Sequence, residues 1–111
     1  MLPKRNRADK KTVDRIFADG KFLNSPTLNF KYITTPTELL RISFIAPKST
    51  AKLAVKRNAL RRRGYAALQK HLPNLPVGVA GVFIFKRHEN DIEKIGKEIQ
   101  TILSKVGHKA D

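Results

Sequence analysis

Apolar residues early in the chain recur with the spacing of a helix. Val13, Ile16 and Phe17 stand at i, i+3 and i+4, which places them on one face of a short amphipathic helix. Thr12 suits the N-cap of this helix, and Gly20 lies just past its end.

The spacing then changes to alternation, which predicts strands. Residues 28–33 and 40–45 alternate in this way. Pro36 lies between them and marks a turn, so we expect these two strands to pair as a hairpin. Residues 21–23 suit a short additional edge strand.

Residues 51–72 have a predominantly helical pattern, which Pro73 stops. Four apolar residues share the side that would face a sheet: Leu53, Leu60, Ala67 and Leu68. Arg57 projects onto the edge of this side, where an unpaired guanidinium is costly to bury. We therefore expect the regular helix to begin near Asn58 as N-cap, with residues 52–57 in a preceding loop.

The last third predicts a buried strand and a second amphipathic helix. Residues 79–85 (VAGVFIF) are apolar throughout, as in a strand buried on both faces, although Gly81 weakens it. Asp91 caps the last helix and Gly107 ends it. The apolar stripe of this helix is Ile92, Ile95, Ile99, Ile102, Leu103 and Val106.

The order of elements, α, β, β, β, α, β, α with the edge strand included, predicts an α+β sandwich of helices against one small sheet. A chain of 111 residues supports one modest core. We find no internal repeat or dividing linker, so residues 1–111 form a single domain. Residues 1–11, which are basic and polar, form an extended N-terminal arm.

Basic charge is concentrated in the centre of the chain. There are 23 Lys and Arg against 9 Asp and Glu, a net charge of +14. Eleven of the basic residues, and no acidic residue, lie between Leu39 and Arg87. A solvated face normally mixes signs, whereas a block of one sign neutralises phosphates and releases counterions. We expect nucleic-acid binding here; charge does not distinguish RNA from DNA.

Few residues suit catalysis. The three histidines have no metal-ligand spacing and are interpreted as surface residues: His71, His88 and His108. Asp91 is better explained as a helix cap than as a catalytic acid beside Glu89 and Glu93. There is no cysteine, and no phosphate-binding glycine loop or nucleophile motif. We expect no protein-borne active site.

Membrane and export signals are missing from the sequence. No apolar run approaches the roughly 20 residues of a membrane span, and the N-terminus lacks the apolar region of a signal peptide. We therefore expect a cytoplasmic protein with no membrane partner. We also expect nucleic-acid partners and no small-molecule substrate.

The central segment carries a motif of a known family. It reads Lys52-Leu-Ala54-Val55-Lys56-Arg57-Asn58-Ala-Leu-Arg61-Arg62 and resembles the K-x-A-V-x-R-N-x-x-[KR]-R signature of the bacterial ribonuclease P protein component. The basic start, Pro3-Lys4-Arg5-Asn6-Arg7, and the segment Phe17-Ala-Asp-Gly20 also resemble that family. The resemblance covers nearly the whole chain.

Four positions depart from the family pattern. Ala59 stands where a third arginine is common, and Tyr65 where a further basic residue is expected. Val13 and Lys31 stand where the family often has aromatic residues. These departures concern the contacts with the tRNA leader more than membership of the family.

The resemblance implies a subunit of a ribonucleoprotein endonuclease that removes 5′ leaders from precursor tRNA. Its partners would be ribonuclease P RNA and precursor tRNA. The RNA would carry the chemistry with bound magnesium, and the protein alone would bind no cofactor or metal. The implied fold has a left-handed crossover from the third strand through the central helix to the last strand, as in one domain of a small-subunit ribosomal protein. About 98% of such crossovers are right-handed, so this hand comes from the resemblance alone.

The resemblance also implies where RNA binds. The RNA subunit would contact Lys48, Lys52, Lys56, Arg57, Asn58, Arg61, Arg62 and Arg63. The arm would contact RNA through Lys4, Arg5, Asn6 and Arg7. The leader would lie in a cleft between the first helix and the sheet, with Phe17, Lys31 and Tyr32.

Aromatic residues of the first predicted helix and of the strand at residues 28–33 can stack unpaired bases or fill a core. By pattern alone, Phe17 and Phe30 suit the core better. Alternation places Phe30 and Tyr32 on one side of their strand and Lys31 on the other. Because the family's aromatic falls at Lys31, the Lys31 side is favoured as the cleft, with Phe17 lining it and Phe30 in the core.

Two other classes of protein remain open. A structural RNA-binding protein of ribosomal type would share the charge and the lack of catalytic residues, but would not stimulate leader cleavage. A DNA-binding architectural protein would prefer duplex DNA and form a dimer, for which the sequence shows no hydrophobic seam.

Overall fold

A computed structural model describes residues 8–36, 40–71 and 78–107. The elements follow in the order α1 (Lys10–Asp19), β1 (Lys21–Asn24), β2 (Leu28–Thr34), β3 (Leu40–Ile45), α2 (Ala54–His71), β4 (Val79–Phe85) and α3 (Ile92–Gly107). This confirms the expected α+β class, the short edge strand and the bounds of the last strand. Within the described residues, none of the helices is long and apolar enough to cross a membrane.

The four strands form one mixed sheet in the order β1-β2-β4-β3. β1 pairs with β2, and β2 with β4, in antiparallel fashion, whereas β3 and β4 are parallel. The predicted hairpin of β2 with β3 is wrong, because β4 lies between them. The physical reason is that β4 is apolar on both faces, so the central position buries it best. β3, α2 and β4 form the unit for which the resemblance implies a left-handed crossover.

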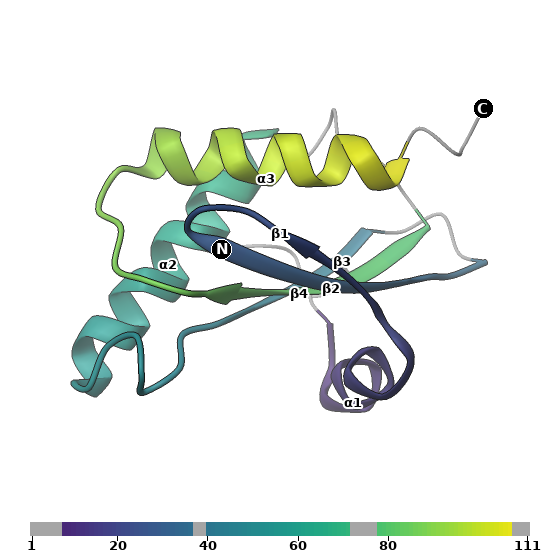
Figure 1. Ribbon diagram of the computed structural model, residues 1–111, viewed down its shortest axis with the longest axis horizontal. Helices are drawn as coiled ribbons and strands as arrows, with labels where there is room; N and C mark the ends of the chain where they lie inside the picture. Colours follow the sequence, from purple (N-terminus) through teal and green to yellow (C-terminus); the bar gives the residue numbers. More distant parts are fainter. Residues whose placement is uncertain (1–7, 37–39, 72–77, 108–111) are drawn as a thin grey trace.

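The helices cover the two faces of the sheet unequally. α2 and α3 lie over one face and α1 over the other (Figure 1). The larger core fills the α2 and α3 side and includes Phe30, Phe44, Phe83 and Phe85. A smaller cluster under α1 joins Ile16 to Ala80 and Val82. The sheet therefore has one face that two helices cover and one face that a single short helix covers only in part.

Gly81 in the middle of β4 makes room for an aromatic ring. A Cβ at this position would lie 2.3 Å from Cε1 and Cζ of Phe30. The Phe30 ring is fully buried and stacks on Phe83, with ring centroids 4.3 Å apart, and on Tyr32, at 5.4 Å. The glycine that weakened the strand pattern is therefore required by the close approach of Phe30.

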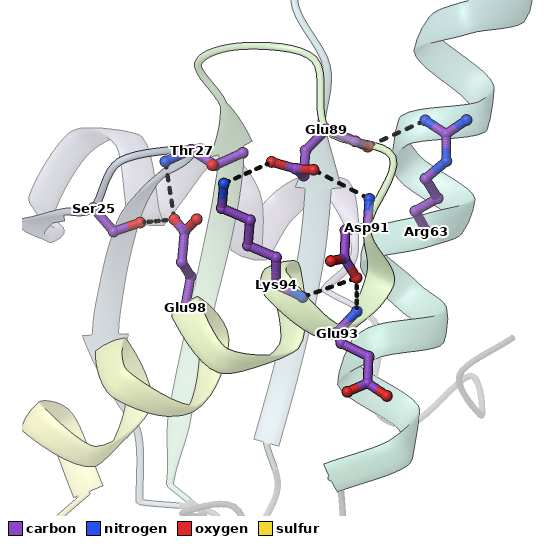
Figure 2. Close-up of polar contacts among 8 residues, drawn as sticks. All are labelled: Ser25, Thr27, Arg63, Glu89, Asp91, Glu93, Lys94 and Glu98. Carbon is purple, nitrogen blue, oxygen red and sulfur yellow. Dashed lines mark hydrogen bonds and ion pairs between the residues drawn. The ribbon is translucent and has the colours of Figure 1, made fainter.

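The N-cap predicted from the sequence is wrong for α1 and is confirmed for α3. Asp9, not Thr12, is the N-cap of α1: its carboxylate accepts a hydrogen bond of 2.8 Å from the Thr12 backbone N–H. α1 begins at Lys10, so the end of the predicted arm is helical. The predicted cap of α3 is confirmed, since Asp91 accepts from the Glu93 N–H at 2.9 Å (Figure 2).

α3 is fastened to the turn between β1 and β2 by one carboxylate. Glu98 accepts hydrogen bonds from the Ser25 hydroxyl and from the Thr27 backbone N–H (Figure 2). Partial burial raises the pKa of Glu98, but these hydrogen bonds outweigh it and leave the pKa below its ordinary value of 4.5. The ionised carboxylate is therefore the form that holds the turn to the helix.

Candidate nucleic-acid interface

The cations of α2 point away from the core because the helix buries only one side. Leu60, Gly64, Ala67 and Leu68 are its buried residues, at the spacing of a single face. The residues of the motif and its approach that are exposed are Lys48, Lys52, Lys56, Asn58, Arg61 and Arg62. Three of the four apolar residues predicted to face the sheet do so, whereas Leu53 is 59% exposed.

Arg57 explains why α2 begins earlier than expected. The helix starts at Ala54, so Asn58 lies inside it and is not its N-cap. The Arg57 guanidinium donates hydrogen bonds from Nη1 to the carbonyl oxygens of Ala51, at 3.1 Å, and Lys52, at 2.7 Å. These two acceptors remove the cost of an unpaired guanidinium, which was the reason for placing residues 52–57 outside the helix.

The loop that leads into α2 is fastened at a second point. The Thr50 hydroxyl donates to the Phe85 carbonyl oxygen at 2.7 Å, and Ala51 is buried. The loop is thus held both to the end of β4 and, through Arg57, to α2. The backbone of this loop therefore loses little conformational entropy when a ligand binds there, which favours affinity.

A groove runs between the start of α2 and the edge strand β3. It has a volume of about 340 Å³ and is lined by residues 43–46 together with Arg57, Asn58 and Arg61. Arg61 donates from Nη1 to Oδ1 of Asn58 at 3.2 Å. Of the described residues that line this α2–β3 groove, none is acidic. The groove therefore offers two planar guanidinium groups, which suit bidentate contacts with phosphate.

The three consecutive arginines diverge, as expected for a helix. Arg61 lines the α2–β3 groove, whereas Arg62 lies near Tyr65 on a different face of α2. Arg63 is partly buried and donates to the Glu89 carbonyl oxygen at 3.3 Å (Figure 2). The structure therefore brings Arg57, Asn58 and Arg61 together and turns Arg63 toward the segment before α3.

The contacts predicted for the arm involve residues that precede the described part of the chain. Lys4, Arg5, Asn6 and Arg7 lie outside the described residues. The described chain starts at the edge strand, where the Ala8 N–H donates to the Ile42 carbonyl oxygen at 3.3 Å. Ile42 belongs to β3, the strand that forms one wall of the α2–β3 groove.

The predicted leader residues divide between the two faces of the sheet. Lys31 Nζ lies 5.5 Å from the centroid of the Phe17 ring and 3.3 Å from the Phe17 carbonyl oxygen. Tyr32 is not beside them, because it stacks on Phe30 and packs against the larger core. Phe17 is 41% exposed, so the interpretation of this residue as core is wrong, whereas Phe30 is core as expected.

One residue of the surface around Lys31 and Phe17 was not predicted from the sequence, namely Phe22. It is 49% exposed and is the Cα partner of Lys31 in the β1–β2 pair. The edge strand at residues 21–23 was predicted, but its register against β2 was not, and only the register shows that Phe22 and Lys31 are neighbours.

Two of the histidines and Asp9 have hydrogen-bond partners within the structure. His71 Nδ1 lies 3.1 Å from Nε2 of Gln100, and His88 Nε2 lies 2.9 Å from Oδ1 of Asn90; His108 is outside the described residues. Hydrogen bonds from Thr12 hold the pKa of Asp9 below its ordinary value. Across residues 8–36, 40–71 and 78–107, no group of three His, Asp or Glu side chains could hold a metal ion.

Solved ribonuclease P proteins have the same fold. The protein from Thermotoga maritima matches with a TM-score of 0.80 at 18% identity, over 91% of this chain and 97% of that one. The protein from Staphylococcus aureus matches with a TM-score of 0.74 at 13% identity, over 96% and 97%. No curated protein matches the chain.

A family model described as Ribonuclease P matches residues 2–107, nearly the whole chain. The match includes the arm, the α2–β3 groove and the surface around Lys31. The chain therefore belongs to the ribonuclease P protein family.

Proposed function

We propose that this chain binds the catalytic RNA of ribonuclease P through the α2–β3 groove and the 5′ leader of precursor tRNA through the surface around Lys31. Membership of the family makes it a subunit of an endoribonuclease complex with ribonuclease P RNA as partner. In this proposal the RNA performs the cleavage with bound magnesium, and the protein assists by positioning substrate. The observation that carries it is the grouping of Arg57, Asn58 and Arg61 in one groove without acidic residues among its described lining.

The charge of the chain supports a polyanionic partner for the groove. At a net charge of +14, self-repulsion disfavours the compact state until opposite charge screens it. No acidic residue occurs in the first turn of α2, where the N–H groups of a helix favour negative charge. Lys52 and Lys56 are exposed at this same end, so cations and backbone dipoles act in the same direction.

The positions of the two surfaces allow both RNAs to bind at once. The α2–β3 groove lies at the β3 edge of the sheet, whereas Phe22 belongs to β1 at the opposite edge. A protein that bridges two RNA molecules requires separate surfaces of this kind. The arrangement favours a subunit that holds precursor tRNA beside ribonuclease P RNA over a structural protein that binds a single RNA.

Reconstitution with a bacterial ribonuclease P RNA tests the proposal. Cleavage of precursor tRNA at low magnesium concentration should be stimulated by the protein. The protein alone, incubated with precursor tRNA and magnesium, should leave the substrate intact, because the ionisable groups of its described residues form no cluster that could hold a metal ion to activate water. RNA binding without stimulation would indicate a structural RNA-binding protein, and cleavage by the protein alone would contradict the division of labour.

A further inference from the structure

Two half-exposed aromatic rings flank one lysine at the β1 edge of the sheet. Phe17 and Phe22, at 41% and 49% exposure, are the aromatic members of the exposed large hydrophobic residues in the described part of the chain. Lys31 is adjacent to both, over the Phe17 ring and opposite Phe22 in the strand register. We call these three residues the Phe17–Lys31–Phe22 surface.

The backbone holds the three residues in place without a ligand. Directly opposite residues in an antiparallel pair have Cβ atoms about 4.5–5.5 Å apart, so Phe22 and Lys31 project from the same face as neighbours. Gly20 joins α1 to β1 at close range: its N–H donates to the Ile16 carbonyl oxygen at 2.7 Å, and a Cβ would lie 2.3 Å from that oxygen. The short connection fixes the end of α1, with Phe17, beside β1.

The chemistry of the surface fits successive nucleotides of an unpaired strand. Aromatic rings stack on any base because every base has a π-face. The Lys31 ammonium has three donors, and the Phe17 carbonyl oxygen accepts one of them at 3.3 Å. The others are available to a phosphate that links two bases.

We propose that Phe17 and Phe22 are two stacking platforms for successive unpaired nucleotides of the leader, with Lys31 contacting the phosphate between them. The inference rests on the proposed function and deepens it by assigning Phe22 a role and by giving the surface two nucleotide positions. It also places the path of the leader over the end of α1 and across β1.

The surroundings favour a stacked strand over a ligand held mainly by charge. α1, the helix that carries Phe17, has Asp14 and Asp19 as well as Lys10, Lys11 and Arg15, so the local charge is mixed. A single phosphate contact to a single strand changes the slope of log affinity against log salt by about 0.7. Leader binding here should therefore depend weakly on salt, in contrast to binding in the α2–β3 groove.

The test uses reconstituted holoenzyme and precursor tRNAs whose leaders are shortened one nucleotide at a time. For the unaltered protein, affinity relative to mature tRNA should rise over two successive leader positions. Phe22→Ala and Phe17→Ala should each remove a different one of these two increments, about 5- to 150-fold for a lost base stack. Phe22→Tyr should retain its increment, and mature tRNA should bind every variant equally.

Several results would overturn the inference. If Phe17→Ala and Lys31→Ala weaken leader binding but Phe22→Ala does not, the second platform is wrong and the proposed function stands. If no variant changes leader affinity, the leader binds elsewhere and the leader part of the proposed function fails too. If Phe22→Ala changes only self-association in sedimentation, the surface binds a second copy of the chain. Thermal unfolding should show all variants folded, because both rings are half exposed.

Discussion

At the scale of single residues, Arg57 and Arg61 differ in what their guanidinium groups already bind. Arg57 holds two carbonyl oxygens of the loop before α2, so it has a structural role besides any contact with RNA. Arg61 bonds to the neighbouring Asn58 side chain, which a phosphate can replace at small cost. The same substitution at the two positions should therefore have different consequences.

Arg61→Ala should weaken binding of the RNA subunit by about 1–3 kcal/mol, the range for lost charge-assisted hydrogen bonds, with little change in the free energy of unfolding. Arg57→Ala should weaken binding to a similar extent and also lower stability. Filter binding and urea unfolding measure the two effects. Lys94→Ala is the control, since Lys94 lies on α3, away from the groove, and its exposed side chain makes an ion pair with Glu89 at 3.6 Å. Equal loss in all three variants would indicate diffuse attraction instead of a site.

Phe30→Ala should lower the free energy of unfolding by about 3–5 kcal/mol, because the ring is fully buried between Phe83 and Tyr32. Urea unfolding followed by circular dichroism gives the value. Phe22→Ala removes an equally large ring from an exposed position of the same sheet, so its cost should be small. A well-folded Phe30→Ala variant that had lost leader affinity would reverse the assignment of faces.

Lys31→Ala should weaken the binding of precursor tRNA more than the binding of mature tRNA, because only the precursor has a leader that the Lys31 ammonium can contact. Equilibrium binding to the holoenzyme measures both affinities. Lys105→Ala, an exposed lysine of α3, removes the same charge far from the Phe17–Lys31–Phe22 surface in sequence and serves as control. Equal weakening of both tRNAs by Lys31→Ala would show that Lys31 acts only through general charge.

Alternation along β2 was sufficient to separate Phe30 from Lys31, because the side-chain period of a strand is two. It also placed Tyr32 with Phe30, and the structure keeps it there. Phe17 was misjudged because helical spacing tells which residues share a face, not how far a short helix covers the sheet. Phe22 could not be found by either rule, since its importance depends on pairing with a residue nine positions later.

At the scale of elements, helices were located more securely than strand partners. The bounds of β4 follow from a continuous apolar run, and α3 from its cap and stripe. Which strand pairs with β3 is a long-range choice, and the short connection from β2 to β3 favoured the wrong partner. The start of α2 was misplaced for a local reason, because the loop carbonyls that satisfy Arg57 cannot be inferred from spacing.

The contact between α3 and the β1–β2 turn predicts a dependence of stability on pH. The pKa of Glu98 is lowered in the folded protein, so the stabilisation is fully present above the ordinary value of 4.5 and is lost as pH falls through the folded pKa. Glu98→Gln should cost about 1–2 kcal/mol at pH 7 and progressively less below about pH 4.5. Urea unfolding from pH 7 to pH 3 measures this difference.

Glu93→Gln, in the first turn of α3, is the control for Glu98→Gln. Glu93 is exposed, so its substitution should have a smaller effect throughout the pH range. If the two variants lost the same stability at every pH, the hydrogen bonds to Ser25 and Thr27 would not be the cause.

At the scale of the whole molecule, the two proposed RNA surfaces use opposite edges of one sheet. The basic block predicted the first surface, because charge of one sign over a long segment is visible in the sequence. The second surface has mixed charge and is assembled from three separate elements, so neither composition nor a local motif indicated its full extent. The resemblance to the family pointed to Phe17 and to the position of Lys31, where the family often has an aromatic residue, and the strand register pointed to Phe22.

The position of β4 has a consequence for the order in which the protein can fold. β4 is the last of the described strands along the chain but lies in the interior of the sheet, between β2 and β3. Until residues 79–85 are available, β3 has no neighbour among the described strands and β1–β2 is an isolated hairpin, which is marginal in water. The basic motif is therefore synthesised before the strand that fixes its groove. Pairing across such distances in sequence slows folding, and a nascent chain of this charge can meet RNA before its sheet has closed.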